Sequence, residues 1–335
     1  MQSIAFFNNK GGVGKTTLLC NVAAYLALTD KKKVLVVDAD PQCNATQLML
    51  SEEEVFKLYD SSSSFTIYSI IHPLSIGKGY AAAITARSVP DYGVDLIPGD
   101  PRLALKEDLL SKDWQDAVSG DIRGLRTSYL FTEFLIRCQG YDFVLFDMGP
   151  SLGSINRSVL LSCDFFLSPM SIDIFSLKAI ENISAAILEW NKRISHGLSQ
   201  VDKELKHDLP SLRTFDIKFA GYVAQQYIQK TTQGEQRAVA SYEKIMRRIP
   251  KTIKTFFVDK LKPAKVVGID YEVGTIPNLY SLIPMSQTAH KPIFSLKAKD
   301  GVRGAHFNKV READAIFRDI TKQLLANLKA LSRND

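Results

Sequence analysis

The chain has 335 residues, of which 45% are hydrophobic and 23% are charged, so it can form the core of one large α/β domain or of two small ones. Its formal charge of +6 permits an acidic partner such as nucleic acid without requiring one, since such a balance can also belong to an ordinary solvated surface. No apolar run approaches the ~18 residues of a membrane span, and the four scattered cysteines form neither a CxxC pair nor a zinc pattern, as expected in a reducing cytoplasm.

Apolar segments that are predicted to be β-strands alternate with helical patterns along the chain. They cover residues 4–8, 33–40, 94–100, 141–150, 164–171, 215–226 and 265–277. Their apolarity is continuous, which is typical of strands that are buried on both faces. Strands that are separated by helices favour a doubly wound, mostly parallel sheet flanked by helices, and ligands bind to such sheets at the carboxyl ends of the strands. The sequence therefore predicts an α/β fold.

Two polar stretches interrupt this alternation. Residues 100–130 are charged and compatible with helix, and we expect them to form a surface excursion before the strand at 141–150. Residues 196–213 form a second polar link. The sequence shows no internal repeat and no clear boundary. We therefore predict a single domain over residues 1–335, with surface insertions near 100–130 and 196–213.

A glycine-rich segment at residues 10–17, KGGVGKTT, follows the first predicted strand and precedes a helix that should begin near Lys15. The general phosphate-loop pattern GxxxxGK[ST] would place a glycine where this chain has Asn9, so the motif deviates from it. Glycines allow backbone N–H groups to surround phosphate oxygens, and the helix N-terminus adds its positive dipole end. Lys15 is expected to bind the β- and γ-phosphates and Thr16 to hold Mg²⁺. The predicted nucleotide contacts are Gly11, Gly12, Val13, Gly14, Lys15, Thr16 and Thr17. This loop makes the predicted fold one of the P-loop NTPase type.

Three acids lie where strands end beside this loop. Asp147 ends an apolar run, so its carboxylate should hold Mg²⁺, through water because Mg²⁺ gives up its hydration reluctantly. Asp38 ends another strand and is expected to join that water shell, with Asp40 close by. The alternative for Asp38 or Asp40 is that the carboxylate only caps a helix or turn. Gly149 and Pro150 follow as a switch that would sense the γ-phosphate.

Four motifs in this order resemble those of the ParA/MinD family of deviant Walker A ATPases, and in particular the ParA/Soj-type partition ATPases without an N-terminal helix-turn-helix domain. The matching segments are residues 10–17, 38–46, 141–153 and 275–296. The resemblance covers most of the chain. It is specific for the family and much less specific for the biological task of a member.

The resemblance implies roles for individual residues. Lys10 would reach across a dimer interface to the phosphates of the partner's ATP, and Asp40 would orient or deprotonate the attacking water. Gln225, Pro277 and Asn278 would contact the adenine base. The alternatives are that Lys10 serves its own subunit or only solvates the loop, and that Pro277 belongs to an ordinary turn.

Basic residues late in the chain provide a candidate DNA surface. On a helix expected over residues 239–253, four cations would share one face by their spacing, namely Lys244, Arg247, Arg248 and Lys251. Such a stripe can follow DNA phosphates without reading bases, although a basic helix face is often only solvated. The tail near residues 311–335 has helical apolar spacing flanked by acids, which favours a helix packed on the domain over a membrane anchor.

Taken with the resemblance, these features predict a cytoplasmic, nucleoid-associated and Mg²⁺-dependent ATPase. It would form a homodimer in its ATP state, bind DNA nonspecifically and serve plasmid or chromosome partition or cargo positioning. A protein activator of hydrolysis, either ParB-like or a cargo adaptor, is implied by the family alone. The alternatives are a nucleotide-dependent protein-interaction module, as in a mobile-element or defence system, and a membrane-associated MinD-like positioning ATPase.

Overall fold

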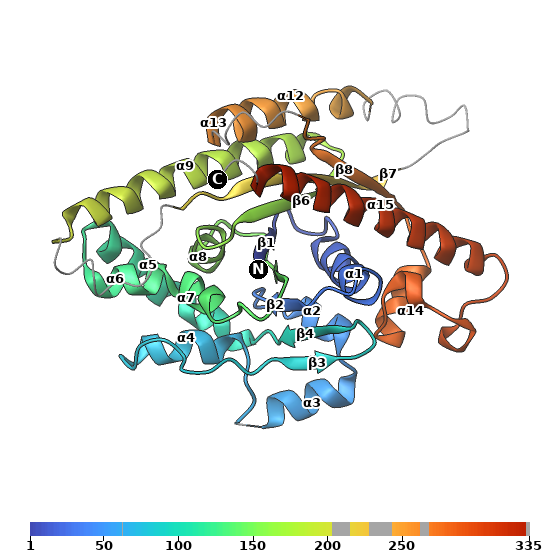
Figure 1. Cartoon of the computed structure of the whole chain (residues 1–335), viewed down its shortest axis with the longest axis horizontal. Helices are drawn as coiled ribbons and strands as arrows, with labels where there is room; N and C mark the ends of the chain where they lie inside the picture. Colours follow the sequence, from blue (N-terminus) through green and yellow to red (C-terminus); the bar gives the residue numbers. More distant parts are fainter. Residues whose placement is uncertain (62, 203–214, 228–242, 262–267, 333–335) are drawn as a thin grey trace.

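The computed structural model describes residues 1–61, 63–202, 215–227, 243–261 and 268–332. Eight strands form one sheet in the order β3-β4-β2-β5-β1-β6-β7-β8 (Figure 1). All neighbouring strands run parallel except β3 and β4, which pair antiparallel at one edge. The strands are β1 (Gln2–Phe6), β2 (Val34–Asp38), β3 (Arg87–Val89), β4 (Val94–Ile97), β5 (Phe143–Asp147), β6 (Phe165–Ser171), β7 (Lys218–Tyr227) and β8 (Glu272–Pro277). The predicted doubly wound α/β fold is confirmed.

Helices cover both faces of the sheet, so its strands are buried on both sides. Along the first strand and just after it, Ile4 and Phe6 belong to one core while Ala5 and Phe7 belong to the other. This is the physical origin of the continuous apolar runs in the sequence. The helices are α1 (Lys15–Leu28), α2 (Asn44–Met49), α3 (Glu52–Asp60), α4 (Ile67–Ser75), α5 (Glu107–Val118), α6 (Ile122–Ser128), α7 (Leu130–Ile136), α8 (Ser154–Leu160), α9 (Ile174–Gln200), α12 (Ile249–Ile253), α13 (Asp259–Leu261), α14 (Leu282–Ala289) and α15 (His306–Ser332).

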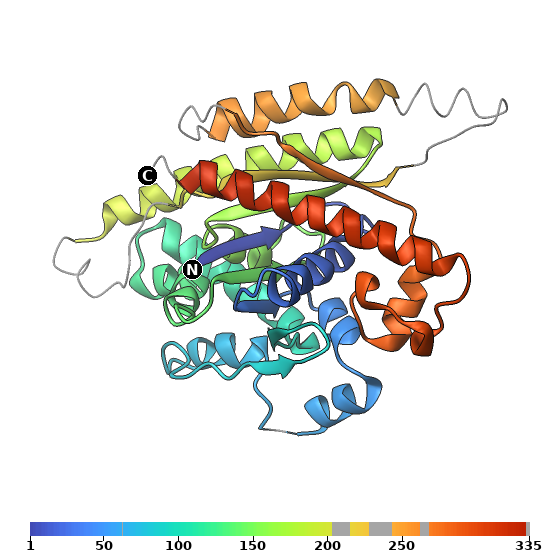
Figure 2. The ribbon, with the colours of Figure 1, turned by 45° about the vertical axis from the view of Figure 1, so that its right-hand side comes forward.

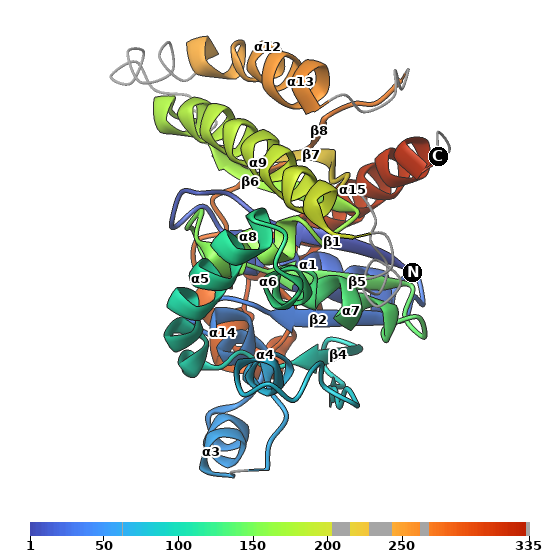
Figure 3. The same cartoon turned by 90° about the vertical axis from the view of Figure 1, so that its left-hand side faces the viewer.

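Different helices cover the two faces of the sheet. Helices α1 and α15 pack together on one face, and α15 also lies along β7 and β8 (Figure 2). Helices α5, α8 and α9 cover the opposite face, and α12 lies on the outer side of α9 (Figure 3). The apolar stripe of α15 is buried in the core, at Phe317, Ile320, Leu324, Leu328 and Leu331. The expectation that the tail packs on the domain is therefore confirmed. No helix in the described part of the chain is long and apolar enough to cross a bilayer.

The expected surface excursion at residues 100–130 is wrong, because this stretch closes one core. Leu110 and Trp114 of α5 and Leu125 of α6 are buried against the sheet face, and the buried carboxylate of Asp113 accepts from the Thr127 hydroxyl at 2.8 Å. A Cβ on Gly124 would lie 2.4 Å from the backbone of α5, and one on Gly197 would lie 2.0 Å from the carbonyl of Ala117. These glycines permit the close packing of α5, α6 and α9.

Two other expectations changed in detail. The second polar link begins inside α9, which runs on to Gln200, and residues 203–214 of that link lie outside the described residues. The helix expected over residues 239–253 is interrupted by a turn at Arg247 and Arg248, after which α12 begins with Pro250 in its first turn. Proline has no N–H to give to a preceding helical turn and suits the start of a new helix. Residues 239–242 lie outside the described residues.

Candidate functional site

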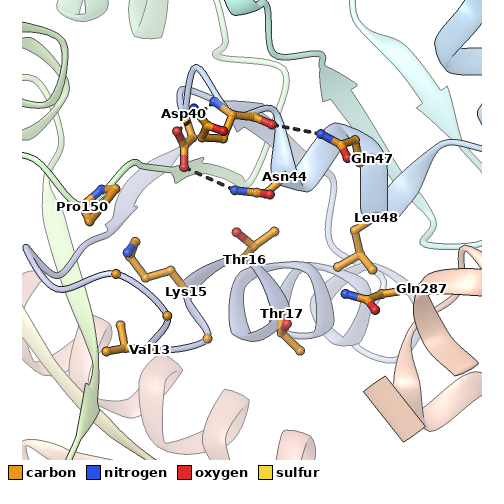
Figure 4. Close-up of a pocket in the computed structure, with 14 residues that line it drawn as sticks. Val13, Lys15, Thr16, Thr17, Asp40, Asn44, Gln47, Leu48, Pro150 and Gln287 are labelled. Carbon is orange, nitrogen blue, oxygen red and sulfur yellow. Dashed lines mark hydrogen bonds between the residues drawn. The ribbon is translucent and has the colours of Figure 1, made fainter. Parts of the chain in front are cut away.

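A pocket of about 540 Å³ lies at the carboxyl ends of the central strands (Figure 4). The loop at residues 11–17 forms one wall of it, and Asp40 and Pro150 face this loop from neighbouring strand ends. Gly12 and Gly14 both have φ of 70°, in the left-handed region that favours glycine. No side chain caps the N-terminus of α1, and its first turn holds no acid. The backbone N–H groups and the positive dipole end of α1 are therefore left for an anion.

Lys15 is 8% exposed and points into the pocket, where its Nζ donates to the carbonyl of Lys10 at 3.2 Å (Figure 4). Burial lowers the pKa of Lys15, while the nearby carboxylates of Asp147 and Asp40 oppose that shift. A buried ammonium beside free backbone N–H groups is suited to a polyanion such as a chain of phosphates.

Thr16 and Asp147 meet at the base of the pocket. The Thr16 hydroxyl donates to Asp147 Oδ2 at 2.7 Å. The other carboxylate oxygen, Oδ1, is buried and has no hydrogen-bond partner among the described residues. Burial, followed by the charge of Asp38, raises the pKa of Asp147 well above its usual range. A hydroxyl beside a carboxylate oxygen without a partner fits a hard divalent cation that keeps its water shell. The described residues contain no cluster of three or more metal ligands, and Mg²⁺ with phosphate needs none.

Asp38 is fully buried and does not line the pocket. Its Oδ2 accepts from the Thr46 backbone N–H at 2.8 Å and from the Thr46 hydroxyl at 2.6 Å. The same hydroxyl accepts from the N–H of Gly99 at 2.8 Å. Burial raises the pKa of Asp38 to about 6 against the opposing effect of the Thr46 hydrogen bonds. Asp38 thus ties β2 to α2 and to the end of β4, which matches its alternative structural role, while its part in holding a metal stays a prediction.

Asp40 is 6% exposed and faces the loop across the pocket. Its carboxylate accepts from the backbone N–H of Gln42 at 3.0 Å and from the amide of Asn44 at 3.5 Å (Figure 4). A Cβ on Gly149 would lie 3.2 Å from Asp40 Oδ1, so the backbone after β5 approaches this carboxylate closely. Asn156 of α8 fixes that backbone by donating to the carbonyl of Gly149 at 2.8 Å. An acid held in this way can orient a water molecule next to a bound phosphate.

Lys10 is not among the residues that line the pocket. Its Nζ forms an ion pair with Asp173, which also caps α9 by accepting from the N–H of Ser176 at 3.0 Å. Burial raises the pKa of Asp173, but the hydrogen bonds from Lys10 and from backbone N–H groups outweigh it and leave the pKa below its ordinary value. The backbone carbonyl of Lys10 therefore contacts Lys15, while its ammonium is held by Asp173.

The three residues that are expected to contact the adenine base lie on the other side of the phosphate loop from the pocket. Gln225 packs against Gly14, where a Cβ would come within 3.2 Å of its side chain, and its buried Nε2 has no partner among the described residues. Ile276 pairs with Gln225, so Pro277 and Asn278 follow at the adjacent strand end, and both are exposed. None of Gln225, Pro277 and Asn278 lines the pocket, and their contact with a base stays a prediction.

The four cations of the candidate DNA surface are exposed, and their contact with DNA stays a prediction. Lys244 precedes the turn at Arg247 and Arg248, and Lys251 lies on α12 beyond it. Arg247 also forms an ion pair with Glu243 at 3.6 Å. The helical spacing overlooked this turn because Pro250 can occupy the first turn of a helix as well as break one.

Sequence reasoning missed several polar residues that shape the site. Asn44, Gln47 and Gln287 line the pocket, and Gln47 belongs to the short helix α2, which directly follows Asp40 and its turn. Asn156 and Asp173 act from helices α8 and α9. Asn44 and Gln287 lie inside motif segments but carry no charge that draws attention, and Asp173 meets Lys10 only through a tertiary contact across 163 positions.

Comparison with known proteins adds to this geometry. The AAA_31 family model, described as an AAA domain, matches residues 1–200. The chain is 27% identical over 256 residues to the chromosome-partitioning ATPase Soj of Thermus thermophilus, covering 76% of this chain and 83% of Soj. It is 31% identical over 223 residues to a probable plasmid-partitioning protein ParA of the same organism, covering 64% and 59% of the two chains.

Solved structures share the fold of this chain. Protein DIP2308 of Corynebacterium diphtheriae is 34% identical with a TM-score of 0.65, and the match covers 87% of this chain and 97% of that one. A putative plasmid partition protein of Borrelia burgdorferi bound to AMPPNP has a TM-score of 0.58 at 18% identity, covering 97% and 98%, and shows the shared fold alone. The chain therefore belongs to the AAA_31 family, within the ParA/MinD-type P-loop ATPases.

Proposed function

We propose that this chain is a Mg²⁺-dependent ATPase that pairs with a second copy in its ATP state, binds DNA nonspecifically in that state and releases DNA after hydrolysis. The observation that carries the proposal is the convergence of Lys15, Thr16, Asp147 and Asp40 around the uncapped N-terminus of α1. The names of Soj and ParA place such proteins in chromosome and plasmid partition. The proposed task is partition or cargo positioning, in the cytoplasm and over the nucleoid.

In this proposal the loop binds ATP through backbone N–H groups and the ammonium of Lys15. Thr16 and Asp147 would hold Mg²⁺, with Asp38 behind them in the buried network. When bound, this ion supplies positive charge that neutralises the phosphate oxygens. Asp147 is suited to that role because its orphaned oxygen gains a partner only when a cation or its water arrives.

Asp40 is the proposed positioning acid for the attacking water. The N–H of Gln42 and the amide of Asn44 fix its carboxylate, so the water meets an oriented acceptor. Positioning is the larger effect in phosphoryl transfer, because the transition state requires little proton abstraction. Gly149 and Pro150 lie between Asp40 and the loop and form the proposed switch.

Lys10 is the proposed link between nucleotide and pairing. A lysine on a flexible stem can neutralise phosphate charge in a second subunit, as an arginine finger does in trans. Here Lys10 is held by Asp173 of its own chain, so pairing requires it to exchange this carboxylate for the partner's phosphates. A protein activator, either ParB-like or a cargo adaptor, is the proposed stimulus for hydrolysis.

Pairing is tested by sedimentation velocity of the Asp40→Ala variant with ATP, ADP or no nucleotide. Slow hydrolysis in this variant should preserve an ATP-bound pair, and adding Lys10→Ala should return it to single chains that still bind ATP. Pairs that persist without Lys10 would remove it from the interface, and rapid phosphate release by Asp40→Ala would remove Asp40 from its assigned role.

DNA binding is tested by gel shift with random duplex DNA. Binding should require ATP and weaken as salt rises, because counterion release drives contacts with phosphate. The double charge reversal Arg247→Glu with Arg248→Glu should abolish the shift and spare hydrolysis. The matched control reverses Lys297 and Lys299, which are exposed elsewhere. Binding that ignores both nucleotide and these arginines would instead favour a nucleotide-dependent protein-interaction module.

A further inference from the structure

Helix α3 carries an apolar surface that the described residues leave exposed. The helix lies at the periphery beyond β3 and β4 (Figures 1 and 3), and Leu58 is its buried side chain. Phe56 is 76% exposed and Tyr59 is 40% exposed. With Leu50 and Val55 they line a second pocket of about 780 Å³, which we name the α3 groove. An exposed phenylalanine in a concave apolar site is a feature of protein interaction surfaces.

The charges at this groove define what it can hold. Glu52 and Asp60 line it, and no lysine or arginine does so among the described residues. The neighbouring acids are already satisfied, since Glu53 pairs with Lys57 and Glu54 pairs with an arginine of β3, whereas Glu52 and Asp60 form no ion pair in the described part of the chain. Phosphates and nucleic acid are therefore repelled here. A segment with apolar side chains between lysines or arginines is complementary.

The groove shares a wall with the nucleotide pocket. Gln42 and Gln47 line both, and the Gln47 amide donates to the carbonyl of Gln42 at 3.0 Å. Gln42 in turn holds Asp40 through its backbone N–H. Cys43 lines the groove with φ of 55°, which is strained for a residue other than glycine, and its N–H donates to the carbonyl of Asp40 at 2.8 Å. An occupant that shifts this turn also shifts the acid that faces the phosphate loop.

We propose that the α3 groove is the docking site for a basic, apolar segment of a partner protein, through which that partner changes the rate of ATP hydrolysis. The effect on rate rests on the proposed ATPase function, whereas the binding does not. A second copy of this chain fits less well, because a symmetric contact would set Glu52 and Asp60 against the same acids of the other copy. The volume suits one or two protruding side chains rather than a flat interface.

The test uses the full chain and a fluorescein-labelled peptide of about 12 residues, with Leu and Phe at helical spacing and Lys between them. A matched peptide carries Glu in place of each Lys. Anisotropy should show saturable binding of the basic peptide alone, weakening with salt. Phe56→Ser should weaken binding about tenfold or more, because it removes a large apolar contact. Glu52→Lys with Asp60→Lys should abolish it.

Controls use the same substitutions elsewhere. Phe307 is 40% exposed on α15, and Glu312 and Asp319 are exposed on the same helix. Phe307→Ser and the double change Glu312→Lys with Asp319→Lys should leave binding unchanged. Equal binding of both peptides, or wild-type binding by Phe56→Ser, would overturn the proposal. A different sedimentation coefficient of the Phe56→Ser chain without peptide, compared with the wild-type chain, would also overturn it. That result would show that the groove is a contact between two copies of the chain.

Phosphate release supplies the second readout. The basic peptide should change the rate for the wild-type chain and leave the Phe56→Ser rate unaffected, while both chains share the same rate without peptide. If the chain hydrolyses ATP but does not bind the peptide, the α3 groove is not the proposed docking site, while the proposed ATPase function stands. A third outcome is that the chain binds the peptide through Phe56 and yet hydrolyses no ATP. That result would overturn the proposed ATPase function and the effect on rate, but it would leave the docking site in place.

Discussion

Replacing Thr46 by valine should destabilise the whole chain, although Thr46 contacts no predicted ligand. Its fully buried hydroxyl donates to Asp38 at 2.6 Å and accepts from the N–H of Gly99 at 2.8 Å. Valine keeps the shape and removes both hydrogen bonds. A bond to a charged group contributes about 1.5–3 kcal/mol, and leaving a buried N–H without a partner costs about 1–3 kcal/mol. The expected loss is therefore about 2.5–6 kcal/mol.

The assay is thermal unfolding followed by far-ultraviolet circular dichroism, with Thr46→Ser as the matched control. Serine keeps the hydroxyl and loses a buried methyl group, which costs about 1 kcal/mol. At about 2 °C per kcal/mol for a chain of this size, Thr46→Val should lower the Tm by roughly 5–12 °C and Thr46→Ser by much less. Equal losses for the two variants would refute the network, because the methyl group and not the hydroxyl would then carry the stability.

Two further predictions concern the same end of the sheet. Burial raises the pKa of Asp38 to about 6, so the folded chain binds protons more readily than the unfolded chain, and this contribution to stability is lost as pH rises from about 4 through 6. In the absence of nucleotide, Asp38→Asn should make the Tm depend less on pH between about pH 4 and pH 6. An unchanged dependence of Tm on pH would contradict the raised pKa of Asp38. Glu107 accepts from the backbone N–H groups of Ser154 and Ile155 at the start of α8, directly after the switch. Glu107→Ala should therefore speed amide exchange at residues 149–155, and unaltered exchange there would show that the contact does not hold the switch.

The fold and the phosphate-binding wall could be predicted because both depend on local pattern. A strand buried on both faces is apolar throughout, and a loop that crowds N–H groups around an anion needs glycines at fixed positions. Strand β3 escaped notice because it is three residues long, contains Arg87 and Ser88, and pairs only at an edge. Residues 100–130 were mistaken for surface because many charges surround the few buried positions of α5 and α6.

The remaining features of the site depend on tertiary contacts that carry no sequence signature. Asp38 and Asp40 are two residues apart, yet one is sealed behind Thr46 and the other faces the pocket. Lys10 is held by Asp173, which is 163 positions away in the chain. Which side chain approaches which is decided by the packing of α2 and α9 on the sheet, and spacing along the chain cannot report it.

The central claim is that the loop at residues 11–17 binds ATP through Lys15. It is tested most directly by isothermal titration of ATP with Mg²⁺ into the wild-type chain and into Lys15→Ala, with Lys291→Ala as a matched change of a largely buried lysine outside the pocket. The account predicts saturable binding by the wild-type chain and Lys291→Ala, and none by Lys15→Ala. Binding by Lys15→Ala with wild-type affinity would contradict it.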